Sequence, residues 1–151
     1  MKKLMCAAAA LAALTTALPA AAQFAKPEDA IKYRQSVMTV LGAHFGRVAA
    51  MAQGKAPYDA AEFAKRAERV AMISPLLSEG FSADTKGLPN SDLKPEMWAN
   101  RADFDAKMKD LVDRSATLAT VAKSGDLAKS KAAFFDAANT CKACHDKYKT
   151  D

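Results

Sequence analysis

Two cysteines and a histidine stand together near the end of the chain, as Cys141, Cys144 and His145 in the run Cys-Lys-Ala-Cys-His. This C-x-x-C-H spacing is the attachment motif of c-type haem, in which two thiols add across the vinyl groups of one porphyrin edge and the next residue offers an imidazole to the iron. At about 100° per helical residue, Cys144 lies about 60° to one side of Cys141 and His145 about 40° to the other. All three can face one flat cofactor, so the sequence predicts one covalent haem c per chain, with His145 as an axial iron ligand.

The same residues could serve three other kinds of site. A thioredoxin-like redox pair lies at a helix N-terminus, where the helix dipole lowers the thiol pKa, whereas this pair lies near the C-terminus of a predicted helix. A structural zinc site needs four ligands, and His44, the remaining histidine, lies away from the main apolar stripe of its helix. A disulfide across C-x-x-C within a helix would be strained. Haem attachment is therefore the favoured interpretation.

Residues 1–22 have the pattern of a secretory signal. Residues 1–3 are positively charged, residues 4–18 are apolar and rich in alanine, and small residues follow up to Ala22. This order of n-region, h-region and A-x-A site is typical of a cleaved signal peptide. The apolar run is short for a membrane span of about 20 residues, and an N-terminal anchor helix is the alternative. We expect cleavage after Ala22, a periplasmic location, and no membrane attachment after processing.

Composition predicts that residues 23–151 form a single helical domain. Half of the whole chain is hydrophobic, which argues against disorder, and six glycines and six prolines are few for a β-sandwich or barrel. The formal net charge is +5, and Lys2 and Lys3 contribute two of those charges. So mild a charge argues against a nucleic-acid binder with a large cationic face.

Apolar residues recur every three or four positions in four segments, which is the period of an amphipathic helix. Mostly short links join these segments, and no alternating strand pattern occurs between them. The sequence therefore predicts an all-α fold, an antiparallel up-down-up-down four-helix bundle. The expected helices cover residues 27–53, 59–77 (with a kink or an early end at Pro75), 95–122 (with a short turn first) and 126–148, and a long loop covers 79–94.

The stripe of the first helix suggests how the cofactor is held. Arg34 occupies an otherwise apolar position, where a charge needs a counter-anion or a route to solvent. Haem has two propionates, so Arg34 with Gln35 is a candidate propionate clamp; alternatively Arg34 reaches solvent from the edge of the core. Met38, one turn further on, points at the cofactor or only packs in the core. Phe104 and Tyr148 are candidate pocket walls, although aromatic residues in such stripes are usually core.

The first helix also carries apolar residues on a second face. A helix with two apolar faces needs two partners. One is the bundle core, and the other is either the neighbouring helices or a second subunit. This second face therefore predicts a homodimer formed through the first helix. Its residues, at spacings of 4, 3, 4 and 7, are Tyr33, Val37, Val40, His44 and Met51.

Residues 23–151 resemble the cytochromes c′, the class II c-type cytochromes. Three features carry the resemblance: the haem motif is C-terminal, residues 26–35 (KPEDAIKYRQ) look like the opening of the family's first helix, and residues 94–98 (KPEMW) look like the start of its third. The resemblance implies a four-helix bundle with a five-coordinate, high-spin haem, in which His145 is the only protein ligand to the iron and Cys141 and Cys144 form the thioethers.

The resemblance also implies roles for the residues around the haem. Arg34 and Gln35 match the family's propionate-side pair, Met38 matches a bulky apolar residue over the distal iron face, and Lys149 matches a basic residue beside the proximal histidine. Family members bind NO and CO, largely exclude O₂, and are commonly dimeric. The resemblance therefore implies a gas-binding protein, with redox partner proteins as further candidates, rather than an enzyme.

Two alternatives stay open. In relatives of the cytochrome c556 type, a methionine of the first helix binds the iron, which would make Met38 the sixth ligand and the protein a low-spin electron carrier. A purely structural four-helix protein that binds a partner would leave the haem motif and Arg34 unexplained. The sequence assigns no role to Trp98.

Overall fold

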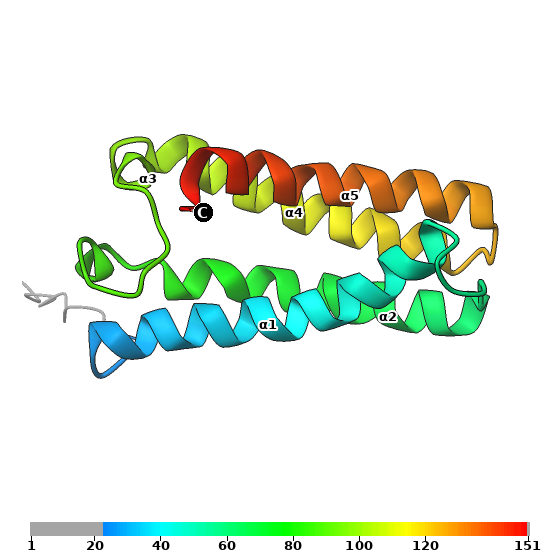
Figure 1. Cartoon of the computed structure of the whole chain (residues 1–151), viewed down its shortest axis with the longest axis horizontal. Coiled ribbons are helices and arrows are strands. Elements are labelled where there is room, and N and C mark those ends of the chain that lie inside the picture. Colours follow the sequence, from blue (N-terminus) through cyan, green and yellow to red (C-terminus); the bar gives the residue numbers. More distant parts are fainter. Residues whose placement is uncertain (1–22, 151) are drawn as a thin grey trace, which may run out of the picture.

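The computed structural model describes residues 23–150, so the predicted signal peptide, residues 1–22, lies outside the described residues. Four long helices form the bundle: α1 (Pro27–Ala52), α2 (Ala60–Ile73), α4 (Arg101–Ala122) and α5 (Leu127–Tyr148). Each runs antiparallel to the long helix before it in the chain (Figure 1). The predicted all-α, up-down-up-down bundle is confirmed. None of the helices within residues 23–150 is long and apolar enough to cross a membrane.

The chain between α2 and α4 crosses one end of the bundle. It contains two 3₁₀ turns, η1 (Ser74–Gly80) and η2 (Ala83–Thr85), and the one-turn helix α3 (Glu96–Ala99). Pro75 stands at the start of η1, so the predicted early end of the second helix is confirmed. This connection lies at the end of the bundle where α1 begins and α5 stops (Figure 1).

Local signals set where the helices begin. Asp59 accepts the backbone N–H of Glu62 at 2.9 Å and caps α2, while Asp126 caps α5 by accepting the N–H of Lys129 at 3.0 Å. The Glu62 carboxylate does not complete a capping box, because it pairs with Arg66 at 2.5 Å instead. The cap at Asp126 fixes where α5 starts, and thereby which of its residues face the bundle interior.

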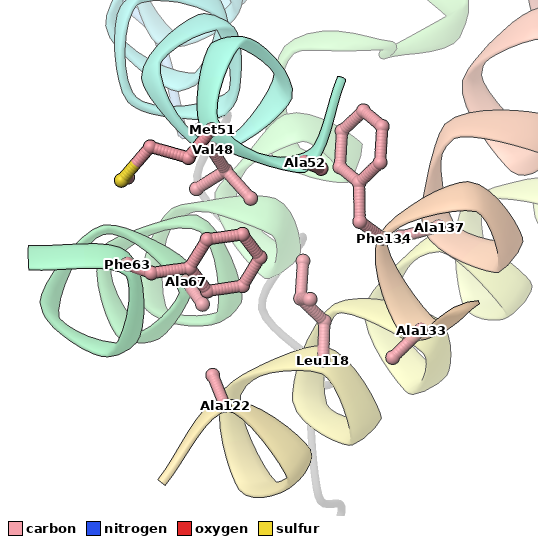
Figure 2. Close-up of a cluster of buried hydrophobic side chains, with 10 residues drawn as sticks. All are labelled: Val48, Met51, Ala52, Phe63, Ala67, Leu118, Ala122, Ala133, Phe134 and Ala137. Carbon is pink, nitrogen blue, oxygen red and sulfur yellow. The ribbon is translucent and has the colours of Figure 1, made fainter. Parts of the chain in front are cut away.

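The core consists of two clusters that differ in side-chain size. The first draws alanines from all four long helices, packed around Phe63, Phe134 and Leu118 (Figure 2). The second lies toward the crossing connection and contains larger side chains, among them Phe104, Met108 and Tyr148. Small residues let helices approach closely, whereas bulky ones hold them apart. Figure 1 shows α1 and α5 further apart at the end that carries α3.

The second apolar face of α1 is largely covered within the chain. Met51 is buried, Val37 packs against the second core cluster, Tyr33 donates a hydrogen bond to a glutamate of η1, and His44 contacts an arginine of α2. Val40 is the exception, with 49% of its surface exposed. The alternative that neighbouring elements cover this face therefore holds for four of its five residues, and the face by itself does not require a second subunit.

Candidate haem site

One cavity of about 360 Å³ lies at the α3 end of the bundle. It is lined from α1, α4, α5 and the crossing connection together. Eight of the nine residues predicted for the site border it; Cys141 does not, but it is half-buried against the second core cluster. The eight are Arg34, Gln35, Met38, Phe104, Cys144, His145, Tyr148 and Lys149.

The two cysteines are free thiols on the last turns of α5. Burial raises the pKa of both thiols above the ordinary value, and for Cys144 the charge of Lys107 acts in the opposite direction. A redox-active pair shows the reverse, a lowered thiol pKa at a helix N-terminus. Among residues 23–150 no group of three or more acidic, cysteine or histidine side chains is arranged to hold a metal ion. Both the thioredoxin-like and the zinc interpretation lack support here.

His145 directly follows Cys144 and borders the cavity, although much of its surface is exposed. Partial burial of the ring lowers the pKa of His145, the charge of Lys149 lowers it further, and Asp146 acts in the opposite direction. The lowered pKa favours the neutral imidazole, which is the form in which histidine binds a metal.

The turn that carries His145 is anchored to α4 through Tyr148. The Tyr148 ring is buried, with its centroid 5.7 Å from that of Phe104 in an edge-on arrangement. Its hydroxyl donates to the Asp103 carboxylate at 2.5 Å, and the Lys147 ammonium donates to the same oxygen at 3.0 Å. These two donors lower the pKa of Asp103. Phe104 borders the cavity and also lies in the core, so it fits both of the places predicted for it, pocket wall and core.

Arg34 is satisfied in a way that the sequence did not predict. It is only 3% exposed, so it does not reach solvent. Its two terminal nitrogens donate to the carbonyl of Gly80 at 2.8 Å, the hydroxyl of Thr85 at 3.2 Å, and the hydroxyl and carbonyl of Ser91 at 3.0 and 3.3 Å. The guanidinium thus donates to neutral oxygens of the crossing connection; burial lowers the pKa of Arg34, and the charge of Asp92 acts in the opposite direction. Its contact with a haem propionate stays a prediction.

The other α1 residues of the site follow Arg34 along the helix. Gln35 is exposed and donates its side-chain N–H to the carbonyl of Asn90 at 2.9 Å. Met38 is half-buried, borders the cavity and also packs against the second core cluster, while its place over the haem iron stays a prediction. Thr39 borders the cavity as well, and its hydroxyl donates to the Gln35 carbonyl at 2.9 Å.

Lys149 is the first residue after α5. Its backbone N–H donates to the carbonyl of His145 at 3.0 Å, and its ammonium donates to the carbonyl of Thr150 at 2.9 Å. Its backbone also forms an isolated antiparallel bridge with Leu93. Lys149 borders the cavity together with His145 and is exposed, and its role beside the proximal imidazole stays a prediction.

The cavity residues that come from the crossing connection were not predicted from the sequence. Residues 79–94 were expected only as a loop, because they have no periodic pattern that would say where each side chain points. Met108 could have been found, since it belongs to the apolar stripe of the third predicted helix. The further lining residues include Phe81, Ser91, Asp92, Leu93 and Met108.

The lining fits a flat, largely apolar group that carries carboxylates. Aromatic, leucine and methionine residues are six of the fourteen that line the cavity; Arg34 and Lys149 supply positive charge and Asp92 one negative charge. Two free thiols and an imidazole on one helix complete the set that covalent haem requires. The residues present therefore fit haem c.

Comparisons with known proteins agree with this fit. The family model described as cytochrome c′ matches residues 29–149. The chain is 44% identical over 127 residues to a cytochrome c′ from Alcaligenes xylosoxydans xylosoxydans, covering 84% of this chain and 98% of the relative. The structure is similar to cytochrome c prime from Shewanella frigidimarina, with a TM-score of 0.82, 42% identity, and 85% and 99% of the two chains covered. It is also similar to a nitric oxide complex of a mutant cytochrome c prime from Alcaligenes xylosoxidans, with a TM-score of 0.78, 43% identity, and 85% and 100% covered.

Proposed function

The chain belongs to the cytochrome c′ family, whose proteins carry covalently attached haem c, and on this premise we propose that it is a periplasmic gas-binding protein with a five-coordinate, high-spin haem iron. One observation carries the proposal. Met38 borders the same cavity as His145, and the Arg34 terminal nitrogens, the Gln35 amide and the Thr39 hydroxyl on its α1 side each donate to an oxygen of the protein. Its role is binding, with electron transfer as an accompanying role, rather than catalysis.

The chain's own residues divide the task of holding the haem. Cys141 and Cys144 supply the thioethers and His145 the axial nitrogen. Arg34 and Gln35 take the propionate side, where a carboxylate would share their N–H groups with the oxygens of the crossing connection. Phe104 forms an apolar wall, and Lys149 stands on the proximal side, next to His145.

The choice of gas depends on whether the cavity residues of α1 offer it a hydrogen-bond donor. When bound, the haem iron supplies the position at which a diatomic gas coordinates. Met38, which borders the cavity, would restrict the space at that position, so small neutral ligands would enter more easily than larger ones. Bound O₂ is stabilised by a nearby donor, but the Arg34 terminal nitrogens bond to the crossing connection and the Thr39 hydroxyl bonds to the Gln35 carbonyl. NO and CO need no such donor, and a relative has been solved as its nitric oxide complex.

The optical spectrum of the reduced protein, with and without CO, tests this proposal. We expect a broad high-spin Soret band that sharpens when CO is added. A sharp low-spin spectrum that is indifferent to CO, and that becomes high-spin in Met38→Ala, would instead establish Met38 as the sixth ligand of a c556-type electron carrier. Met72→Ala is the matched control, because Met72 is 64% exposed on α2 and does not border the cavity.

We also propose that the mature protein is a homodimer. Large apolar side chains remain exposed at Val40 of α1, Met72 of α2 and Leu76 of η1, and also at Leu127 and Phe135 of α5. These residues, rather than the face of α1 that the chain itself covers, are where a second copy would bury apolar surface.

A further inference from the structure

A short segment of the crossing connection, residues 90–94, joins α1 to the end of α5; we call it the strap. On the α1 side, Arg34 donates to both the hydroxyl and the carbonyl of Ser91, at 3.0 and 3.3 Å. Gln35 donates to the carbonyl of Asn90 at 2.9 Å. Two consecutive residues of α1 thus hold two consecutive residues of the strap.

On the α5 side, the strap caps the helix that carries His145. The backbone N–H of Lys94 donates to the carbonyl of Tyr148 at 2.9 Å, and the N–H of Thr150 donates to the carbonyl of Asp92 at 3.1 Å. Between these two bonds Leu93 bridges Lys149. The Lys94 ammonium also donates to a carbonyl in the last turn of α5, at 3.3 Å. The strap thereby satisfies carbonyl groups that a helix C-terminus leaves without partners.

The contacts of the strap with α1 and its contacts with the end of α5 are all made by the same five residues. Ser91, Asp92 and Leu93 also border the cavity, so the strap is part of its wall. Lys149 lies beyond the last residue of α5. Its backbone is held by its own hydrogen bond to the His145 carbonyl and by the antiparallel bridge that pairs it with Leu93. Where the Lys149 side chain sits relative to His145 therefore depends on where the strap sits, and the strap is held by Arg34 and Gln35.

We propose that the strap positions Lys149 beside His145, and that Ser91 is the positioning residue that ties this arrangement to α1. The proposal deepens the proposed function and rests on it for its consequence at the haem. It follows that the two residues assigned to the propionates also hold the proximal side of the site in place. Ser91 acts through Arg34 and Lys149 and is not itself assigned to the haem or the gas.

Amide hydrogen exchange on the haem-loaded protein tests the coupling without any gas. Losing a hydrogen bond to a charged group raises the equilibrium constant for local opening of the backbone by about tenfold. We expect Ser91→Ala to speed exchange at the amides of Lys94, Lys149 and Thr150 by about that factor, and Ser91→Thr to restore slow exchange. The amide of Gly125, at the opposite end of the bundle, should not change.

Ser78→Ala is the matched control, because Ser78 is exposed and the connection uses its backbone carbonyl rather than its hydroxyl. Unchanged exchange at Lys94, Lys149 and Thr150 in Ser91→Ala would overturn the coupling. Gln35→Ala provides a second variant if Ser91→Ala does not fold, and it should act in the same direction with a smaller effect because Gln35 is exposed.

A double-mutant cycle tests whether the coupling acts through Lys149. Ser91→Ala should change the optical spectrum of the NO complex, and in a Lys149→Ala background it should cause no further change. A full effect of Ser91→Ala in that background would overturn the assignment of Lys149 as the positioned residue. If instead no variant, nor the wild type, bound NO, the proposed function would fail, whereas the exchange experiment would still decide the coupling.

Discussion

Replacing Gly80 by alanine tests how closely the crossing connection packs on α1. A Cβ atom at Gly80 would lie 2.6 Å from the Cβ of Arg34, 2.9 Å from the carbonyl oxygen of Ala30 and 3.1 Å from the backbone nitrogen of Arg34. All three atoms belong to the helix itself or to the root of a side chain, so no rotamer change relieves the contact. Gly80 or α1 must move, and the Arg34 hydrogen bond to the Gly80 carbonyl moves with them.

The magnitude follows from two opposing effects. Overpacking a buried site costs about 1–3 kcal/mol, and replacing a glycine whose backbone conformation alanine can adopt returns about 0.4–1 kcal/mol by restricting the unfolded chain. Gly80 is not among the glycines with positive φ, so this gain applies. We expect Gly80→Ala to lower the free energy of unfolding by about 1–2 kcal/mol. With a urea m-value of about 2 kcal/mol/M, the midpoint should fall by about 0.5–1 M.

Urea unfolding followed by far-ultraviolet circular dichroism measures the effect on the haem-loaded protein. Gly46→Ala is the matched control, since a Cβ there meets nothing within 4 Å and the residue is exposed inside α1. It should be neutral or stabilise the protein by about 0.5–1 kcal/mol, because alanine favours a helix over glycine. A Gly80→Ala midpoint equal to or above that of the wild type would refute the close approach of the connection to α1.

Three further predictions concern acid stability, haem attachment and assembly. Hydrogen bonds from the folded protein lower the pKa of Asp103, so its contribution to stability is present above the ordinary carboxyl pKa and is lost as the pH falls through the lower, folded value. Asp103→Asn should therefore unfold more easily than the wild type at pH 7 and equally at very low pH in urea titrations. The denatured wild type should keep one haem in mass spectrometry, and Cys141→Ser should keep it through a single thioether or lose it; an unaltered two-thioether product would contradict the assignment. Sedimentation should show a dimer that Met72→Glu weakens, and a monomeric wild type at high micromolar concentration would count against assembly.

The helices could be predicted because their signals are local. Apolar residues at helical spacing, the caps at Asp59 and Asp126 and the break at Pro75 all act within one or two turns, and the observed helices follow them. The second face of α1 was harder to interpret. Tyr33 and His44 are covered by a glutamate and an arginine that are distant in sequence, and spacing along one helix carries no information about such partners.

The residues of the site likewise divide into those that could be predicted from the sequence and those that could not. Cys144 and His145 share a cavity because they are adjacent residues of one helix, and Arg34 and Met38 join it from the stripe of α1. What holds Arg34 could not be predicted, since its acceptors lie 46 to 57 residues away in a connection without periodicity. Its buried charge was noticed from the sequence, but its partners were not.

The sequence by itself thus determined the elements and the chemistry: four amphipathic helices, a haem-binding motif on the last of them, and a positive charge on the apolar stripe of the first. Only the tertiary structure decided how residues 90–94 run between α1 and α5, which oxygens satisfy Arg34, and that Leu93 pairs with Lys149 in an antiparallel bridge at the end of α5. The physical reason is the range of the interactions. Helix formation depends on neighbours three or four residues apart, whereas the path of a connection is set by backbone groups that find their partners only after the bundle has assembled.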